Sequence, residues 1–117
     1  MDIQAIIFNF SKAPDAAERE ILCALRRRGY RLAANFACGY CDASFEIAEG
    51  KGREALLAAA QALGVEPTEC AVVESECEGL RTAKESGMTA IGIGKAALCV
   101  YADVCLRKLA ELTDIFV

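Results

Sequence analysis

The chain has 117 residues, of which 55% are hydrophobic and 26% charged, and its formal net charge is −4. A chain of this length and composition is expected to form one domain, residues 1–117, with its own hydrophobic core. The acidic balance excludes the basic surface that nucleic-acid binders use to neutralise phosphates. No apolar run of 18 or more residues occurs, so neither a membrane span nor a signal peptide is predicted, and the expected location is the cytoplasm.

Five segments have the composition of β-strands. The first, the fourth and the last are nearly continuous apolar runs, as in parallel strands that are covered on both faces. The five segments are residues 3–8, 30–34, 43–47, 70–73 and 88–93.

Helical periodicity separates these strands. A helix is predicted over 14–28, with Pro14 at its first position, and others over 53–63, 77–86 and 107–112. The first three end at a glycine, which accepts the left-handed backbone conformation at low cost. The alternation predicts an α/β fold, a three-layer α/β/α sandwich around a mainly parallel, Rossmann-like sheet. Ligands of such sheets bind beyond the carboxyl ends of the strands.

The segment 70–94, CAVVESECEGLRTAKESGMTAIGIG, resembles the fourth motif of the haloacid dehalogenase-like superfamily, in particular of the β-phosphoglucomutase-like phosphatases. That motif is an apolar strand ending in E-D-S-x-x-G, then a helix, A-G-M and another strand. Upstream, residues 63–67 resemble the L-G-V-x-P lead-in, and residues 50–52 resemble the G-K-P of the third motif. Residues 29–35 resemble the second-motif strand and 102–112 the closing segment. The resemblance spans nearly the whole chain and implies the core fold of this superfamily.

The departures from the family fall on its catalytic residues. The family's first strand ends in D-x-D, where one carboxylate attacks phosphorus and the other is the general acid/base; here these positions hold Asn9 and Ser11. An amide is neither a nucleophile nor an anionic ligand for Mg²⁺, and a hydroxyl cannot replace a carboxylic acid as a proton shuttle. The second-motif Ser or Thr is Ala34 here, whereas Lys51 matches the third-motif lysine.

The fourth motif of the family carries paired acids, which the resemblance implies as Mg²⁺ ligands. Here Glu74 is followed by Ser75, so Glu74 and Glu76 are the metal candidates. Losing a nucleophile costs roughly 10³- to 10⁶-fold in rate. We therefore expect no cofactor, with Mg²⁺ needed only if some activity survives. Residues 11–29 alone separate the first two strands, too few for the family's helical cap domain.

Backbone N–H groups at helix N-termini can bind anions without help from carboxylates. We therefore expect weak binding of phosphate, or of a small phosphorylated ligand, near Ser11, Asn35 and Lys51. The alternative is a solvated tip with an ordinary surface lysine. A tip without a cap is also a candidate interface for a second copy of the chain or for another protein.

Seven cysteines are present, an odd number, and we interpret most of them as small buried hydrophobes of a reducing compartment. Cys38 and Cys41 form a C-x-x-C, so they are candidates for thiol redox exchange. The segment after them alternates like a strand, however, and not like the helix that lowers a thiol pKa. A zinc site is disfavoured, because the chain has no histidine and no second C-x-x-C.

Three functions remain open. The favoured one is a non-catalytic binding or regulatory module related to the phosphatases, because each substitution removes a different required group. The second is a hydrolase or phosphotransferase that uses Ser11, Glu74 or Glu76 in altered roles. The third is a thiol redox protein that uses Cys38 and Cys41.

Overall fold

The computed structural model describes residues 2–36, 39–47 and 50–117. Within these residues, six strands form one sheet in the order β3-β2-β1-β4-β5-β6, and every neighbouring pair is parallel. The sheet is therefore wholly parallel, where a mainly parallel one was predicted. The strands are β1 (Ala5–Asn9), β2 (Arg31–Ala34), β3 (Ala43–Ser44), β4 (Cys70–Glu74), β5 (Thr89–Ile93) and β6 (Val104–Leu106).

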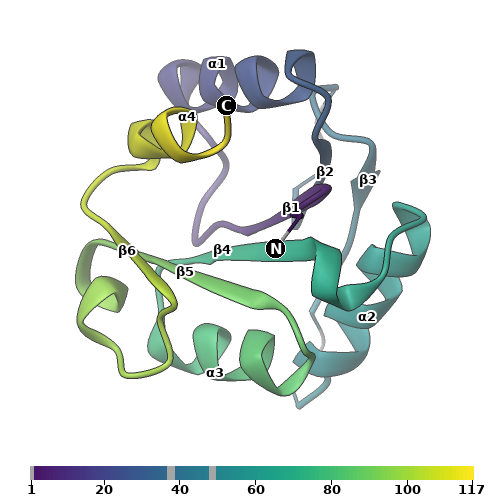
Figure 1. Cartoon of the computed structure of the whole chain (residues 1–117), viewed down its shortest axis with the longest axis vertical. Coiled ribbons are helices and arrows are strands. Elements are labelled where there is room, and N and C mark those ends of the chain that lie inside the picture. Colours follow the sequence, from purple (N-terminus) through teal and green to yellow (C-terminus); the bar gives the residue numbers. More distant parts are fainter. Residues whose placement is uncertain (1, 37–38, 48–49) are drawn as a thin grey trace.

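Helices cover both faces of the sheet, which confirms the three-layer α/β/α sandwich (Figure 1). The helices α1 (Ala16–Arg27) and α4 (Leu112–Ile115) lie on one face, and α2 (Gly52–Ala62) and α3 (Cys77–Glu85) lie on the other. Three 3₁₀ helices are found in the connections: η1 (Pro67–Glu69), η2 (Gly94–Leu98) and η3 (Leu109–Glu111).

The two faces of β1 belong to two hydrophobic clusters. Ile6 and Phe8 pack with the residues of α1 and α4, while Ala5 and Ile7 pack with those of α2 and α3. All four side chains are fully buried. Since neither face of this strand meets water, its sequence is continuously apolar rather than alternating.

Helix α1 begins later than predicted. Asp15, not Pro14, caps it: the Asp15 carboxylate accepts a hydrogen bond from the Glu18 backbone N–H (2.8 Å), and the Glu18 carboxylate accepts one from Asp15 N–H (3.0 Å). This reciprocal pair satisfies two amides that the helix itself leaves free, so the cap decides the starting residue. The predicted ends are confirmed, because Gly29, Gly64 and Gly87 follow α1, α2 and α3 with φ of 100°, 72° and 80°.

The C-terminal region differs from the prediction of one helix over 107–112. Residues Val104–Leu106 form the edge strand β6, and the helical backbone starts only after Lys108, which is extended (φ −136°, ψ 149°). The Glu111 carboxylate accepts a hydrogen bond from Arg107 N–H (3.1 Å) and holds this turn in place. The strand predicted over 43–47 is also shorter, because only Ala43 and Ser44 pair with β2.

The expectation that most cysteines are small buried hydrophobes is wrong for the described residues, among which only Cys70 is buried. Cys77 and Cys99 form a disulfide between the exposed first turn of α3 and the residue after η2, with a Cα–Cα distance of 5.5 Å. Their separation of 22 residues gave no sign of this pairing, because the fold alone brings them together. None of the described helices combines the length and the apolar character needed to cross a membrane.

Candidate functional site

The carboxyl ends of β1 and β4 place Asn9 beside Glu74. The two residues are register partners in the sheet, and Asn9 Nδ2 donates a hydrogen bond to Glu74 Oε2 (2.5 Å). The carboxylate only accepts, so this contact fixes which end of the Asn9 amide faces it. Both residues stand where the family resemblance places a nucleophile and a metal-binding acid.

Glu74 is a buried carboxylate, with 4% of its surface exposed. Its second oxygen accepts a hydrogen bond from Ser75 N–H (3.1 Å). Burial raises the pKa of Glu74 above its ordinary value of 4.5, and the negative charge of Glu76 adds to this; the hydrogen bonds from Asn9, Ser75 and Glu76 oppose it. The net direction is upward, as expected when desolvation disfavours the charged form.

Gly79 leaves the room that the Glu74 side chain occupies. A Cβ at position 79 would lie 1.9 Å from Glu74 Oε2 and 2.1 Å from its carboxyl carbon, closer than atoms can approach. Helix α3 therefore packs its first turns directly against the buried carboxylate. This close approach explains why a glycine stands at position 79. The sequence alone gave no reason for it.

The side chain of Asn35, which the sequence suggested as a phosphate ligand, forms hydrogen bonds with the backbone instead. Its Oδ1 accepts a hydrogen bond from Phe10 N–H (2.8 Å), and its Nδ2 donates one to the Phe10 carbonyl (2.7 Å). The side chain thus ties the tip of β2 to the residue after β1. Ala34, at the second-motif position, is fully buried and presents no polar group.

A cavity of about 450 Å³ opens at this tip, between the ends of β1 and β4 and the first turns of α2 and α3. Asn9 and Ser11 line it, and so do Glu74 and Glu76, which the sequence suggested as metal ligands. We call it the acidic cavity, after the four glutamates among its described lining residues: Glu74, Glu76, Glu78 and Glu85.

Lys51, the expected third-motif lysine, is exposed at the cap of α2 and does not line the acidic cavity. Arg53 does, and it is the one cation among the described lining residues. The structure therefore brings together Asn9, Ser11, Glu74 and Glu76 of the predicted set, but leaves Asn35 and Lys51 outside the cavity. Four carboxylates against one guanidinium disfavour phosphate at this place.

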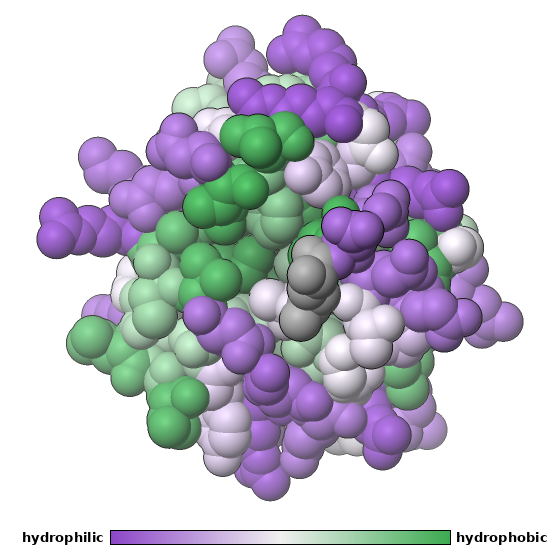
Figure 2. Space-filling view, in the orientation of Figure 1, coloured by the Kyte–Doolittle hydropathy of each residue, from purple (hydrophilic) through white to green (hydrophobic). Residues whose placement is uncertain are grey.

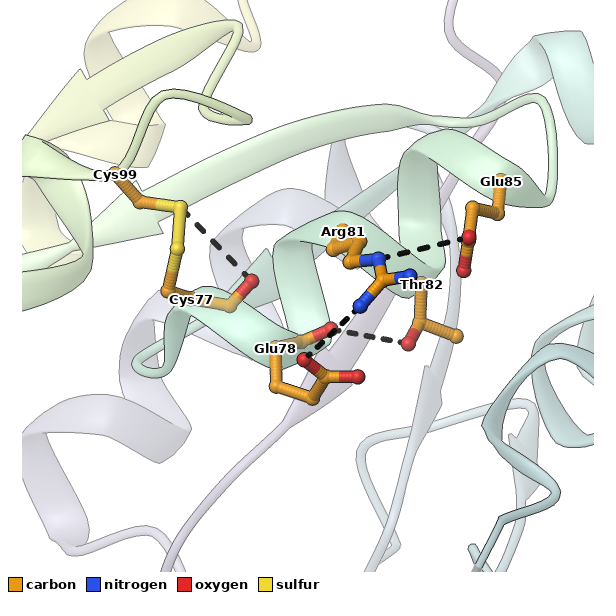
Figure 3. Close-up of polar contacts among 6 residues, drawn as sticks. All are labelled: Cys77, Glu78, Arg81, Thr82, Glu85 and Cys99. Carbon is orange, nitrogen blue, oxygen red and sulfur yellow. Dashed lines mark hydrogen bonds and ion pairs between the residues drawn. A yellow bond between two sulfur atoms is a disulfide. The ribbon is translucent and has the colours of Figure 1, made fainter.

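Arg81 lies outside the cavity wall and pairs with two of these glutamates (Figure 3). It is 3.9 Å from Glu78 and 3.6 Å from Glu85, and all three side chains are at least half exposed. Exposed pairs at such distances neutralise little charge. The Cys77–Cys99 disulfide lies at the N-terminal end of α3, beside Glu76 and Glu78, and ties this end of the helix to the residue after η2.

The donors at the tip do not fit Mg²⁺. No group of three or more His, Cys, Asp or Glu side chains in the described part of the chain could hold a metal ion. The Asn9 amide presents its nitrogen to Glu74, and Ser75 replaces the second acid of the motif. Mg²⁺ demands several oxygen donors in octahedral geometry, and here the best-placed carboxylate already accepts N–H groups on both of its oxygens.

The C-x-x-C hypothesis falls partly outside the described residues, because Cys38 is not among them. Cys41 is half-buried, two residues before β3 begins.

The chain matches no family model. β-Phosphoglucomutase from Bacillus subtilis (strain 168) is 35% identical to it over 68 residues, which are 57% of this chain and 30% of that enzyme. The chain thus corresponds to less than a third of this curated relative.

Solved structures share the fold across nearly all of the chain. A haloacid dehalogenase-like family hydrolase from Streptococcus pneumoniae has a TM-score of 0.73 at 13% identity, with 98% of this chain and 99% of that chain covered. The cobalt-bound deoxy-D-mannose-octulosonate 8-phosphate phosphatase from Haemophilus influenzae has a TM-score of 0.77 at 12% identity, with 98% and 87% covered. The chain therefore has the fold of haloacid dehalogenase-like proteins, and its sequence similarity to β-phosphoglucomutase agrees with the resemblance of its motifs to the β-phosphoglucomutase-like group.

Proposed function

We propose that this chain is a catalytically inactive member of the haloacid dehalogenase-like superfamily, a pseudoenzyme that acts by binding and not by hydrolysis. The observation that carries the proposal is the hydrogen bond from Asn9 Nδ2 to Glu74 Oε2. It puts a neutral amide at the place of the nucleophile and directs that amide toward a buried carboxylate.

The other groups that phosphoryl transfer needs are also missing from the site. Ser11 is exposed and has a hydroxyl in the place of the acid/base carboxylate, and Ala34 is apolar. Lys51 stands away from the acidic cavity, whose wall carries four glutamates. Phosphoryl transfer is catalysed by positioning and by stabilising negative charge, and a wall of carboxylates opposes both the substrate and its transition state.

The open tip supports the binding role. Residues 10–30, all of them described, contain a loop and α1 and no cap domain, so the strand ends stay accessible. Ser11 and Glu76 are exposed there, and Ile47 is 41% exposed at the rim of the acidic cavity. Such a surface suits a protein partner or a second copy of the chain, which light scattering over a range of concentrations would reveal as a mass above that of one chain.

The test is hydrolysis of p-nitrophenyl phosphate with and without Mg²⁺. We expect both rates to equal the background of a blank preparation. Ser11→Ala and Glu74→Ala serve as matched controls against a contaminating phosphatase, whose rate they would leave unchanged. A Mg²⁺-dependent rate that disappears in either variant would show that the site still catalyses transfer in an altered way, and the proposal would be wrong.

A further inference from the structure

A second cavity lies on the other side of the same strand tips and differs in character from the first. Its volume is about 290 Å³, and it shares Asn9, Phe10, Ser11, Glu74 and Ser75 with the acidic cavity. We call it the basic cavity, after the three cations in its wall: Lys12, Arg107 and Lys108. On the face drawn in Figure 2, hydrophobic surface lies between α4 and β6, and hydrophilic groups border it on the left.

The three cations reach the basic cavity from two segments that are far apart in the chain. Lys12 lies in the loop between β1 and α1, whereas Arg107 and Lys108 lie between β6 and η3. None of the ion pairs found within the described residues uses any of the three. None of the three is therefore held in an ion pair with a described carboxylate.

The carboxylates near these cations are already engaged elsewhere. Two line the cavity: Glu18, which accepts from Asp15 N–H in the α1 cap, and Glu74, which accepts from Asn9 and Ser75. A third, that of Glu111, accepts from the backbone N–H of Arg107. Three cations against two lining carboxylates leave the basic cavity with a net positive charge, which favours an incoming anion.

Four of the remaining lining residues are apolar. Phe10, Val73, Ile93 and Leu109 line the basic cavity; Val73 and Leu109 are buried, and the Phe10 ring stacks on that of Phe8 with 5.4 Å between centroids. A rigid apolar wall with a few charged groups is the usual composition of a small-molecule site, and 290 Å³ is near the lower end of the size range of such sites.

We propose that the basic cavity binds a small organic anion, with its carboxylate or phosphate held by Lys12, Arg107 and Lys108 and its apolar part against Phe10, Ile93 and Leu109. This place overlaps the phosphate site expected at Ser11, Asn35 and Lys51 only at Ser11, and neither Asn35 nor Lys51 lines it. The inference holds whether or not the tip catalyses a reaction.

The test is a titration of the whole chain with octanoate and with octyl phosphate, followed by amide chemical shifts and calorimetry. We expect at least one of the two probes to bind and to shift the amides of residues 10–12, 93 and 107–109. Acetate and inorganic phosphate, which lack the apolar part, are expected to bind at least tenfold more weakly, and octylammonium, which has the wrong charge, is expected not to shift these amides.

Arg107→Gln/Lys108→Gln removes two of the three cations from exposed positions and is expected to weaken binding about tenfold, with the melting temperature unchanged. Arg53→Gln, in the acidic cavity, and Lys95→Gln, on η2, are the matched controls and are expected to leave the affinity as it is. The proposal is wrong if neither probe binds, if the double variant binds like the parent, if Arg53→Gln causes the same loss, or if acetate and inorganic phosphate bind as tightly as the longer probes.

Discussion

Asn9 and Glu74 face each other across β1 and β4, and the amide of the first donates to the buried carboxylate of the second. A buried negative charge needs a compensating group, which is a metal ion where two carboxylates meet and a hydrogen-bond donor where only one is present. In this chain Asn9 supplies the donor. The two residues are thus matched to each other, and the match requires no metal.

Asn9→Asp tests this match. The substitution brings a second carboxylate against Glu74, so we expect the free energy of unfolding to fall by about 2 kcal/mol or more at pH 8, and by less at pH 5, because protonation of either carboxyl group relieves the repulsion. Urea denaturation at the two pH values measures the effect. We also expect millimolar Mg²⁺ to stabilise Asn9→Asp but not the parent protein. Equal stability of the two proteins at pH 8 would contradict the match.

Glu74→Gln tests the buried carboxylate through pH. Because burial raises the pKa of Glu74 above 4.5, the folded protein binds this proton more tightly than the unfolded chain. The free energy of unfolding of the parent therefore falls as the pH rises from about 4.5 to the raised pKa, by about 1.4 kcal/mol for each unit of the shift. Glu74→Gln is expected to lose this slope, because the amide that replaces the carboxyl group does not ionise.

Denaturation midpoints between pH 4 and pH 8 measure this slope. Glu85→Gln, which removes an exposed carboxylate from the same acidic cavity, is the matched control and is expected to keep the slope of the parent. Parallel pH profiles for Glu74→Gln and the parent would rule out the buried carboxylate as the source.

Gly79→Ala tests the close approach of α3 to Glu74. At an ordinary helix position this change stabilises a protein by up to about 1 kcal/mol. Here the added Cβ would lie 1.9 Å from Glu74 Oε2, so the side chain must leave its place and we expect a loss of about 2 kcal/mol or more. In the background of Glu74→Ala the contact is absent, and Gly79→Ala is expected to be neutral or stabilising there. A double-mutant cycle in thermal denaturation gives both values.

Cys99→Ser tests the disulfide. A cross-link between residues 22 positions apart lowers the entropy of the unfolded chain by an amount equivalent to about 3 kcal/mol. We expect Cys99→Ser to unfold at a correspondingly lower urea concentration and dithiothreitol to bring the parent to the same midpoint. Cys105→Ser, at an exposed cysteine outside the disulfide, is the control. A parent protein that is insensitive to the reductant would contradict this expectation.

The sequence predicted the central strands because burial on both faces requires a continuous apolar run, and β1, β4 and β5 show such runs. It did not predict β6, which has only three residues. The turn before β6 is held by Asp103, whose carboxylate accepts from Ala90 N–H (2.8 Å) and from Lys84 (3.0 Å). These contacts join residues that are far apart in the sequence, so no local sequence pattern predicts them.

The candidate site, too, was predicted from the sequence only in part. The resemblance assigned Asn9 and Glu74 to one site at the strand ends, but that β1 and β4 are neighbours is known only from the structure, because a parallel sheet does not by itself fix the strand order. The placement of Arg53 in the acidic cavity and of Lys51 outside it was not, because it depends on the residue at which α2 starts. Likewise, Asn35 was predicted to bind phosphate, because nothing in the sequence shows that both of its polar side-chain atoms form hydrogen bonds with the Phe10 backbone.

The position of β1 in the middle of the sheet also shapes how the chain folds. One of its neighbours, β2, follows soon after it, but the other is β4, and the Asn9–Glu74 contact spans 65 residues. Such non-local pairing makes folding slow, because a long loop must close before the contact contributes. During synthesis, β1 leaves the ribosome well before β4 and has an unpaired edge in the meantime, so its apolar segment is open to misassembly until β4 pairs with it.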